Sequence, residues 1–354
     1  MPAHRVDPNV SRRSFLGSAS AFAGAAHLLS GSSAYANAPT SLAATPPAGF
    51  VPMAAPGKII KVSKSDVIMP NGLFPKEEAA RIMLERAMTE LTGEIDLGRA
   101  FARFVHKDDK VAVKMNGIAG QTGGTMATNK ELILPIVAGI LAAGVPAANV
   151  VVYEQYTSFF NGTRVNAKNL PAGVVTAVHG NKDATMSEIR VLGIPTKFVR
   201  PLTDATAVIN VALIKDHSIC GYTGCLKNIT HGSTINPHDF HQHNASPQIA
   251  ALYAQDIVKS RVRLHITDGF KLIYDGGPLD KNPDRRVPHE AVYATTDPVA
   301  MDVIGWNEVE KWRKEKGLPT LTKAGREPTY IRVAGELGLG IANQEQIRLR
   351  EVRL

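Results

Sequence analysis

The alternation of short apolar runs with longer amphipathic segments is the feature of this sequence that most constrains its fold. KIIKVSKS (58–65) precedes a segment with helical apolar spacing at 75–93, and KVAVKMN (110–116) precedes another at 128–144, which NVVVYEQ (149–155) follows. Segments in this order form crossover units, in which a helix returns the chain to a parallel neighbouring strand. The sequence therefore predicts an α/β fold, a mainly parallel sheet with crossover helices.

The second half of the chain continues the pattern less regularly. Four further β-like runs and two helical segments are expected, at 173–178, 206–214, 263–269, 291–296, 247–259 and 297–316. We expect one α/β domain over 58–354, with two lobes and the site between them as an alternative. The polar stretch 156–172 is where a seam between lobes would fall.

Residues 1–36 have the pattern of a twin-arginine signal peptide. Arg12 and Arg13 stand in Ser-Arg-Arg-x-Phe-Leu, a weakly apolar Ala- and Gly-rich stretch follows, and a small-x-small sequence ends at Ala36. The apolar stretch is short and is broken by His27 and Ser30, which argues against a membrane anchor. We expect recognition by the twin-arginine export machinery, cleavage near Ala36, a periplasmic mature protein without stable membrane insertion, and a Pro- and Ala-rich linker over 37–57.

The charge distribution argues against a nucleic-acid partner, and we expect a small-molecule ligand instead. The chain has a net charge of +8, and the signal accounts for three Arg and one Asp, so about +6 is spread over the rest. No long basic cluster or aromatic-interleaved basic stripe is present, which argues against nucleic-acid binding.

The twin-arginine pattern also bears on cofactors. Twin-arginine export carries folded proteins, often with a cofactor already inserted, so a bound cofactor is more expected here.

The loop NGIAGQTGGT (116–125) is the first candidate binding segment. It follows a buried strand and precedes a helix, so Asn116 and Gly117 are candidate cofactor-binding residues at the edge of the sheet where α/β proteins bind ligands. The loop matches neither the dinucleotide fingerprint nor a Walker loop, and a plain connection is an equal alternative.

The stretch KDHSICGYTGCLKNITHG (215–232) is the second candidate. His217, at the end of a strand, is a candidate general acid/base because imidazole titrates near neutral pH, with a structural histidine as the alternative. Lys227 would hold a cofactor or an anion, or else be a surface lysine in a first helical turn. Gly221 and Gly224 are expected to leave room for a cofactor.

Further His, Asp and Cys residues each have a functional and a structural interpretation. The cluster HDFHQH predicts a Ni or Zn site with His238, His241 and His243 as ligands, or an exposed His-rich loop. Asp268 is a turn residue or a catalytic carboxylate. Cys220 and Cys225 are a disulfide, two buried thiols or, less favoured, metal ligands. Asp297 is an expected helix N-cap, with Asp302 one turn further on.

The chain resembles domain-of-unknown-function family 362 over roughly residues 58–354. The resemblance is carried by Lys215-x-His217, by LKN at 226–228, and by LHITDGF and TTDPVAMDVIGW at 264–270 and 295–306. The family has no settled activity. Many relatives add a cysteine-rich iron–sulfur module, and two cysteines are too few to hold such a cluster, so none is expected here.

A more distant resemblance is to the nickel-pincer lactate racemases. It rests on the strand, histidine and Gly-Tyr-x-Gly-x-x-Lys pattern of 204–238, and it implies His217 as acid/base, Lys227 as the residue that carries a nickel-pincer nucleotide, and His243 as a nickel ligand. The chain departs from that family where YEQYTSF replaces the segment with a second catalytic histidine, and where NGIAGQTGG replaces a substrate-binding motif. Lactate racemisation is therefore not expected.

These observations together predict a periplasmic enzyme with a metal or organometallic cofactor. It would move a proton or hydride on a small oxygenated substrate, as an isomerase or oxidoreductase. The alternative is a non-catalytic protein that binds a metal or an anion with the same residues.

Overall fold

The computed structural model describes residues 42–120, 126–180 and 186–354. The predicted signal peptide and the second half of the glycine loop lie outside these residues. Residues 42–354 group as one compact unit, within which the 156–172 stretch lies. Among the helices of the described chain, none combines the length and apolarity that crossing a bilayer requires.

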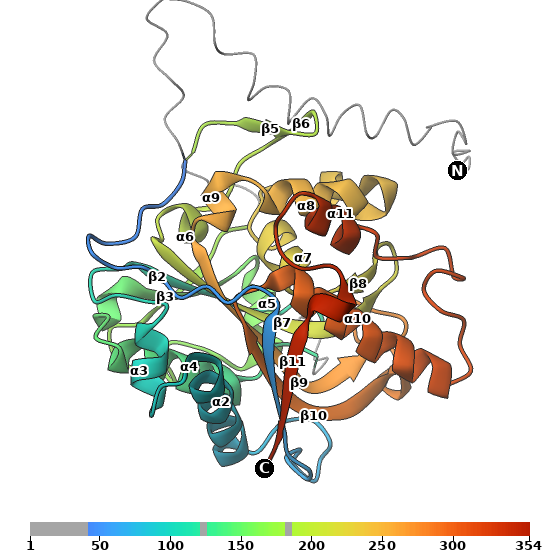
Figure 1. The fold of residues 1–354 in the computed structure, drawn as a ribbon, viewed down its shortest axis with the longest axis horizontal. Coiled ribbons are helices and arrows are strands. Elements are labelled where there is room, and N and C mark those ends of the chain that lie inside the picture. The colour runs from blue at the N-terminus through green and yellow to red at the C-terminus, as the bar shows by residue number, and fades with distance from the viewer. Residues whose placement is uncertain (1–41, 121–125, 181–185) are drawn as a thin grey trace, which may run out of the picture. The chain divides into compact units, whose positions relative to one another are not determined.

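A mixed, mainly parallel sheet forms the centre of the molecule (Figure 1). Its strands run in the order β11-β1-β10-β9-β7-β2-β3-β4, and β8 pairs with β7 as a hairpin. Neighbours are parallel at β9-β7-β2-β3-β4 and at β1-β11, and antiparallel on both sides of β10. The predicted α/β fold class is confirmed. The sheet strands are β1 (Lys58–Ser63), β2 (Val111–Lys114), β3 (Val150–Glu154), β4 (Val175–Val178), β7 (Ala207–His217), β8 (Gly221–Thr223), β9 (Val262–Ile273), β10 (Arg286–Thr295) and β11 (Arg348–Arg353).

Helices cover both faces of the sheet. The helices α2 (Glu77–Thr92), α3 (Leu97–Ala102) and α4 (Lys130–Ala142) pack together on one face, whereas α7 (Cys225–His231), α8 (Ser246–Tyr253), α10 (Pro298–Glu315) and α11 (Tyr330–Glu336) form the other layer (Figure 1). Shorter elements connect them: α5 (Thr157–Thr163), α6 (Arg200–Thr203), α9 (Asp256–Lys259) and the separate hairpin β5 (Ile189–Val191) with β6 (Ile194–Thr196).

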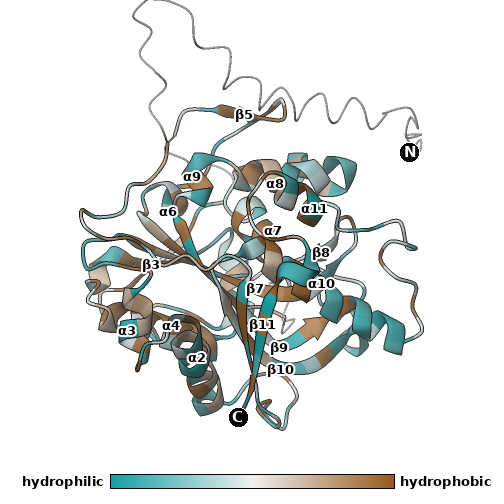
Figure 2. Ribbon diagram, in the orientation of Figure 1, coloured by the Kyte–Doolittle hydropathy of each residue, from teal (hydrophilic) through white to brown (hydrophobic). Residues whose placement is uncertain are grey.

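The burial pattern explains why these segments take these forms. All eleven residues of β7 are buried, as expected for a central strand covered by helices on both faces. Helix α2 buries a stripe at helical spacing from Ala79 to Leu91 and ends at Gly93, whose φ of 79° suits glycine. Figure 2 shows the contrast between the apolar central strands and the hydrophilic edge strand β11.

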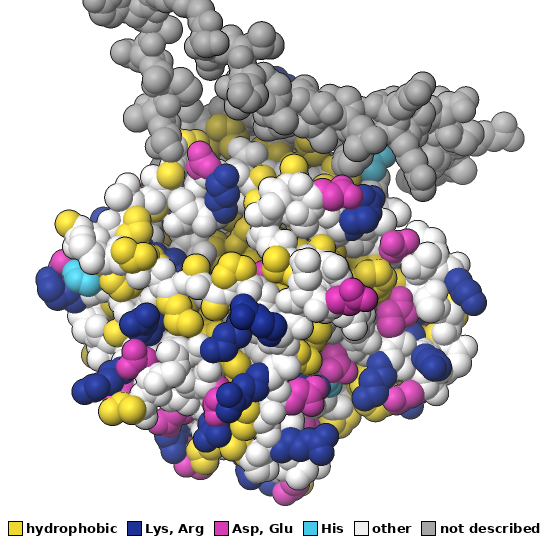
Figure 3. Space-filling model, viewed as in Figure 1, with side chains coloured by type: hydrophobic (Ala, Val, Ile, Leu, Met, Phe, Trp, Pro, Cys, Tyr) yellow, Lys and Arg dark blue, Asp and Glu magenta, His cyan; other side chains and the backbone are white. Residues whose placement is uncertain are grey.

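Most predicted elements are present, with changes at their ends. The strands expected at 206–214 and 263–269 extend to His217 and Ile273, and the expected helix 247–259 divides into α8 and α9 because Gln255 is extended, with ψ of 132°. The edge strand β11 was missed, because its exposed Arg348, Arg350 and Arg353 give no apolar signal. On the face viewed in Figure 3, Lys and Arg side chains gather over this edge, and charge of this kind opposes pairing with another sheet.

The described part of the expected linker is held against the body. The N–H of Ala44 donates to Ser260 Oγ and that of Ala55 to Thr296 Oγ1, both at 2.8 Å. The N–H of Gly57 donates to the carboxylate of Asp297. The backbone N–H groups of these residues thus hold the described part of the linker against the body.

Candidate functional site

A small buried cavity lies where three neighbouring parallel strands end. Lys114, Glu154 and His217 are the last residues of β2, β3 and β7, and parallel neighbours bring their carboxyl ends to one edge of the sheet. The cavity has a volume of about 140 Å³. Its polar lining is Lys114, Asn116, Glu154, Gln155, His217, Thr223, Lys227, Asn228, His231 and His241.

A chain of buried amides forms the floor of the site. The Nζ of Lys215 donates to Asn116 Oδ1 at 2.7 Å, and the amide of Asn116 donates to Asn228 Oδ1 at 3.0 Å. Asn228 in turn donates to Asn210 Oδ1 at 2.7 Å. Because Lys215 can only donate, it fixes the orientation of every amide in the chain. Burial lowers the pKa of Lys215 to about 7.

The ion pair of Lys114 with Glu154 forms one wall. Their side chains meet at 2.9 Å and both are buried. Glu154 also accepts the backbone N–H of Gly117 at 2.8 Å, so the pair fixes the start of the glycine loop. Burial lowers the pKa of Lys114, and the neighbouring carboxylate opposes that change. Since each charge has its counterion, this pair adds little net charge to the cavity.

Lys227 differs from Lys114 and Lys215 in having no partner among the described residues. Its side chain is buried on α7, and its Nζ makes no hydrogen bond or ion pair with any of the described residues. Burial lowers the pKa of this amine. An ammonium group removed from water without a counterion is strongly disfavoured, so Lys227 favours either an anion beside it or loss of its proton.

The first turn of α7 is held by a residue from another helix. Gly224, at the N-cap position, has no side chain, and Asp302 of α10 supplies the missing acceptor to the N–H groups of Cys225 and Leu226. A methyl group on Gly224 would lie 2.4 Å from Asp302 Oδ1, so glycine is required for this approach. The predicted cofactor-binding residues Gly221 and Gly224 do not line the cavity; both allow close backbone packing instead.

The hydrogen bonds of His217 determine its tautomer. The Nδ1 atom accepts the backbone N–H of Ile219 at 3.1 Å and that of Cys220 at 3.4 Å. Burial, with Lys227 as the second cause, lowers the pKa of the ring, which is therefore neutral. A neutral imidazole that accepts at Nδ1 carries its proton on Nε2, so His217 is a hydrogen-bond donor toward the cavity.

His241 has the opposite tautomer. Its Nδ1 lies 2.9 Å from the carbonyl oxygen of Pro237 and must donate to it, which leaves an unprotonated Nε2. Its ring stacks on that of His217, with centroids 5.6 Å apart, and meets His231 edge-on at 4.8 Å. Burial lowers the pKa of His241 to about 4. The site thus combines a hydrogen-bond donor, His217, with a hydrogen-bond acceptor, His241.

Several predicted site residues lie elsewhere. Asp268 is buried on β9, where it accepts the N–H and the side-chain amide of Asn129, so it holds the start of α4. Gly117 packs against the carbonyl of Phe159. His238 and His243 are exposed and do not line the cavity. Of the predicted residues, the structure brings together His217, Lys227, Asn116 and His241.

The predicted metal and cofactor sites can be compared with this arrangement. No group of three His, Cys, Asp or Glu side chains within the described residues is placed to hold a metal ion. The nickel-pincer nucleotide implied by the racemase resemblance needs His243, which lies outside the cavity. A cavity of 140 Å³ is also small beside the 300 Å³ or more typical of pockets for larger organic ligands. The described residues therefore do not fit this nucleotide.

The two cysteines are free, buried thiols. Cys220 Sγ contacts the carbonyl oxygen of Tyr222 at 3.2 Å, and Cys225 Sγ lies 3.7 Å from Thr267 Oγ1. Burial raises the pKa of both thiols, that of Cys220 to about 12. Of the three alternatives, the structure has the two buried thiols.

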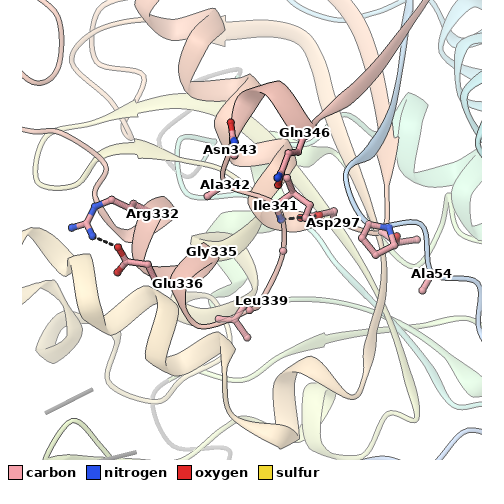
Figure 4. Close-up of a pocket in the computed structure, with 14 residues that line it drawn as sticks. Ala54, Asp297, Arg332, Gly335, Glu336, Leu339, Ile341, Ala342, Asn343 and Gln346 are labelled. Atoms are coloured by element: carbon pink, nitrogen blue, oxygen red, sulfur yellow. Dashed lines mark hydrogen bonds and ion pairs between the residues drawn. The ribbon is translucent and has the colours of Figure 1, made fainter. Parts of the chain in front are cut away.

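A larger and more open cavity beside α11 lacks comparable chemistry (Figure 4). Its volume is about 660 Å³. Asp297 accepts the N–H groups of Gly57, Ala300 and Ile341 there, as the N-cap that the sequence predicted, and Arg332 pairs with Glu336 (Figure 4). The charged side chains that line it are therefore already paired.

Four residues that line the cavity were not predicted as site residues from the sequence: Lys114, Glu154, Asn228 and His231. Each of the first two is the polar last residue of an apolar strand, VAVK and VVVYE. This position was a usable signal, because the ends of neighbouring parallel strands meet. His231 donates from Nε2 to the carbonyl of Phe240 at 3.1 Å and orients the segment that carries His241.

The fold and the cavity define an α/β protein with a buried polar site at the carboxyl ends of its parallel strands. The chain belongs to the domain of unknown function family DUF362, whose sequence pattern matches residues 111–307. No curated protein matches it. Among solved structures, the lactate racemase apoprotein from Thermoanaerobacterium thermosaccharolyticum is similar at 12% identity and a TM-score of 0.37, over 68% of this chain and 54% of that chain. This chain thus matches about half the length of that protein.

Proposed function

We propose that this protein binds a small anionic, oxygenated molecule in the cavity at the ends of β2, β3 and β7 and moves a proton on it. The observation that carries the proposal is the buried Lys227, whose Nζ has no partner among the described residues. Folding desolvates this group, and an interaction with an anionic ligand would offset that cost for its charged form. Structural lysines inside proteins are normally paired.

The other unpaired groups that line the cavity match an anion. His217 Nε2–H and the hydroxyl of Thr223 have no hydrogen-bond acceptor among the described residues, and together with Lys227 they offer three donors. Glu154 is the carboxylate of the lining, and Lys114 neutralises it. A carboxylate of a few heavy atoms suits both the donors and the volume of about 140 Å³.

The two histidine tautomers support proton transfer. His241 Nε2 can take a proton from a bound molecule, and His217 Nε2–H can donate to an oxygen of that molecule. In this scheme His217 polarises the oxygen by its hydrogen bond and His241 is the base, whereas the sequence assigned both the acid and the base role to His217. A poised base beside a polarising donor is what separates an enzyme from a simple binding protein.

Anion binding is tested with small carboxylates in the presence of EDTA. Acetate and glycolate should raise the melting temperature of the wild type in proportion to the logarithm of their concentration, as ligands of the native state do. Lys227→Met should abolish the increase, and Lys314→Met, at an exposed lysine of α10, should leave it unchanged. An equal increase in Lys227→Met would refute the site.

Proton transfer is tested separately, by NMR in D₂O. Loss of the C–H signal next to the carboxylate, faster than with Thr223→Val or His241→Gln protein, would support an enzyme. Binding without exchange across a panel of small hydroxy and oxo acids would favour the rival function, a non-catalytic anion-binding protein.

Metal binding and export stay predictions. Native mass spectrometry of protein from its own export pathway would show whether a divalent metal, or a covalent adduct at Lys227, accompanies the chain. We propose periplasmic export by the twin-arginine route from Arg12 and Arg13. Arg12→Lys with Arg13→Lys should retain the precursor in the cytoplasm, and normal periplasmic yield would contradict this.

A further inference from the structure

Three buried lysines lie at or next to this site, and the Nζ atoms of two of them have hydrogen-bond partners. Lys114 pairs with Glu154 and donates to the carbonyl of Met115, and Lys215 donates to Asn116. Lys227 alone of the three has an Nζ without a partner among the described residues, and it lines the cavity directly. Desolvation favours the neutral form of a lysine amine, and the neutral amine is the form that attacks a carbonyl carbon.

We propose that Lys227 forms a Schiff base with a small 2-oxo acid. This inference rests on the function proposed above and names the substrate class of the same site. A 2-oxo acid supplies a carboxylate, which can accept from the hydroxyl of Thr223, and next to it a carbonyl carbon for the amine. The carbonyl oxygen can only accept a hydrogen bond, so it also matches the Nε2–H group of His217, which donates one.

The reaction balances with groups present in the site. The 2-oxo acid binds beside the ammonium form of Lys227. His241 Nε2 then takes one proton from this ammonium group. The amine nitrogen then attacks the carbonyl carbon, a C–N bond forms, and a proton moves from nitrogen to oxygen to give a carbinolamine. His241 returns its proton to the hydroxyl, the C–O bond breaks, and one water leaves. The net change converts an ammonium and a ketone into a protonated imine and water.

The neighbouring side chains assist without further reagents. His217 Nε2–H is oriented by two backbone N–H groups at its Nδ1, so it donates to the oxygen throughout. His241 keeps its Nε2 unprotonated because Nδ1 is committed to Pro237. Asp302 holds the first turn of α7 and thereby the position of Lys227 (α7 and α10 in Figure 1).

The experiment traps the imine by reduction. The purified full-length protein is incubated with pyruvate and sodium cyanoborohydride, digested, and mapped by mass spectrometry. We expect one adduct on the peptide that contains Lys227, with the mass of pyruvic acid less one oxygen atom. Its rate should exceed that of any exposed lysine at least tenfold, and glyoxylate should react likewise. Because the map is made on the wild type, the result does not depend on a variant that folds.

Two controls separate the outcomes. Lys227→Arg, which cannot form an imine, should lose the adduct, and Lys314→Met should keep it. Adducts only on exposed lysines, with the Lys227 peptide unmodified, would overturn the inference. Acetate has no ketone and cannot be trapped, so a Lys227-dependent acetate response without pyruvate trapping would sink the Schiff base and leave the anion site standing. Loss of both responses would sink both.

Discussion

Asp302 on α10 accepts the backbone N–H of Cys225 at 2.6 Å, although 77 positions separate the two residues. The same carboxylate accepts the N–H of Leu226 and the hydroxyl of Tyr330. Helix α7, which carries Lys227, is thus capped by a distant side chain where its own N-cap residue, Gly224, has none.

The buried carboxyl of Asp302 predicts a pH-dependent stability. Burial raises its pKa from the ordinary 3.8 to about 7. The folded state therefore binds the proton more tightly than the unfolded chain, and this contribution to stability is present below pH 3.8 and is lost as pH rises toward 7. The Asp302→Asn variant lacks this titrating group, so the comparison is between the unfolding free energies of the wild type and of this variant. We expect the wild-type value minus the variant value to fall by about 4 kcal/mol from pH 4 to pH 8. Urea titrations across that range would measure it, and a pH-independent difference would contradict the assignment.

Lys227 should cost stability. Burial lowers the pKa of its amine below the ordinary value. The native state is therefore destabilised relative to the unfolded chain, and this destabilisation grows as pH falls below the ordinary lysine pKa. We expect Lys227→Met, which keeps the length of the side chain, to raise the unfolding free energy by about 1–3 kcal/mol at neutral pH, with a smaller gain at pH 10. Lys314→Met is the exposed control and should change it by less than about 0.5 kcal/mol. A destabilised Lys227→Met protein would mean that the amine has a structural partner.

The strand end that carries His217 depends on a buried ion pair. Arg326 donates to Asp216 Oδ1 at 2.7 Å and to the carbonyl of His217 at 2.9 Å, and Asp216 is fully buried. Arg326→Ala leaves that carboxylate with Arg313 at 3.9 Å, and we expect a loss of about 3 kcal/mol. Arg332→Ala removes an exposed pair with Glu336 and should cost at most about 1 kcal/mol. Urea titrations measure the unfolding free energy of both variants. An equal loss in Arg326→Ala and Arg332→Ala would show that the burial of Asp216 does not strengthen its ion pair.

The thiols should be unreactive in the native protein. Both sulfur atoms are buried and both thiol pKa values are raised, which leaves little thiolate for attack. Ellman's reagent should detect no fast-reacting thiol under native conditions and two per chain in denaturant without reductant. If denatured, unreduced protein gave none, Cys220 and Cys225 would be a disulfide.

The sequence was sufficient for features that depend on neighbouring residues. The apolar run of β7, the stripe of α2 and the cap at Asp297 are local patterns, and all three are present as predicted. Local spacing also placed His217 and Lys227 together, because a short hairpin and the start of α7 separate them. The strand ends could have revealed Lys114 and Glu154, but only with the knowledge that β2 and β3 are neighbours.

Side-chain direction was beyond the sequence. His243 was predicted as a ligand from the HDFHQH cluster and the racemase resemblance. However, His243, Asn244 and Ala245 all have φ between 50° and 59°, a turn that their residue types do not predict. Non-glycine residues rarely adopt this region, so no local rule predicts three in succession. The tautomers of His217 and His241 likewise depend on backbone groups brought close by the folded turn.

The position of β1 between β10 and β11 has a consequence for the order in which the chain can fold. Residues 58–63 pair with 291–295 on one side and with 348–353 on the other, so the first strand of the described residues has neither of these neighbours until most of the chain has been synthesised. A ribosome-bound intermediate that stops before residue 286 would have β1 and the apolar face of α2 uncovered. Until β10 has been synthesised, this segment exposes apolar surface of the kind that chaperones bind.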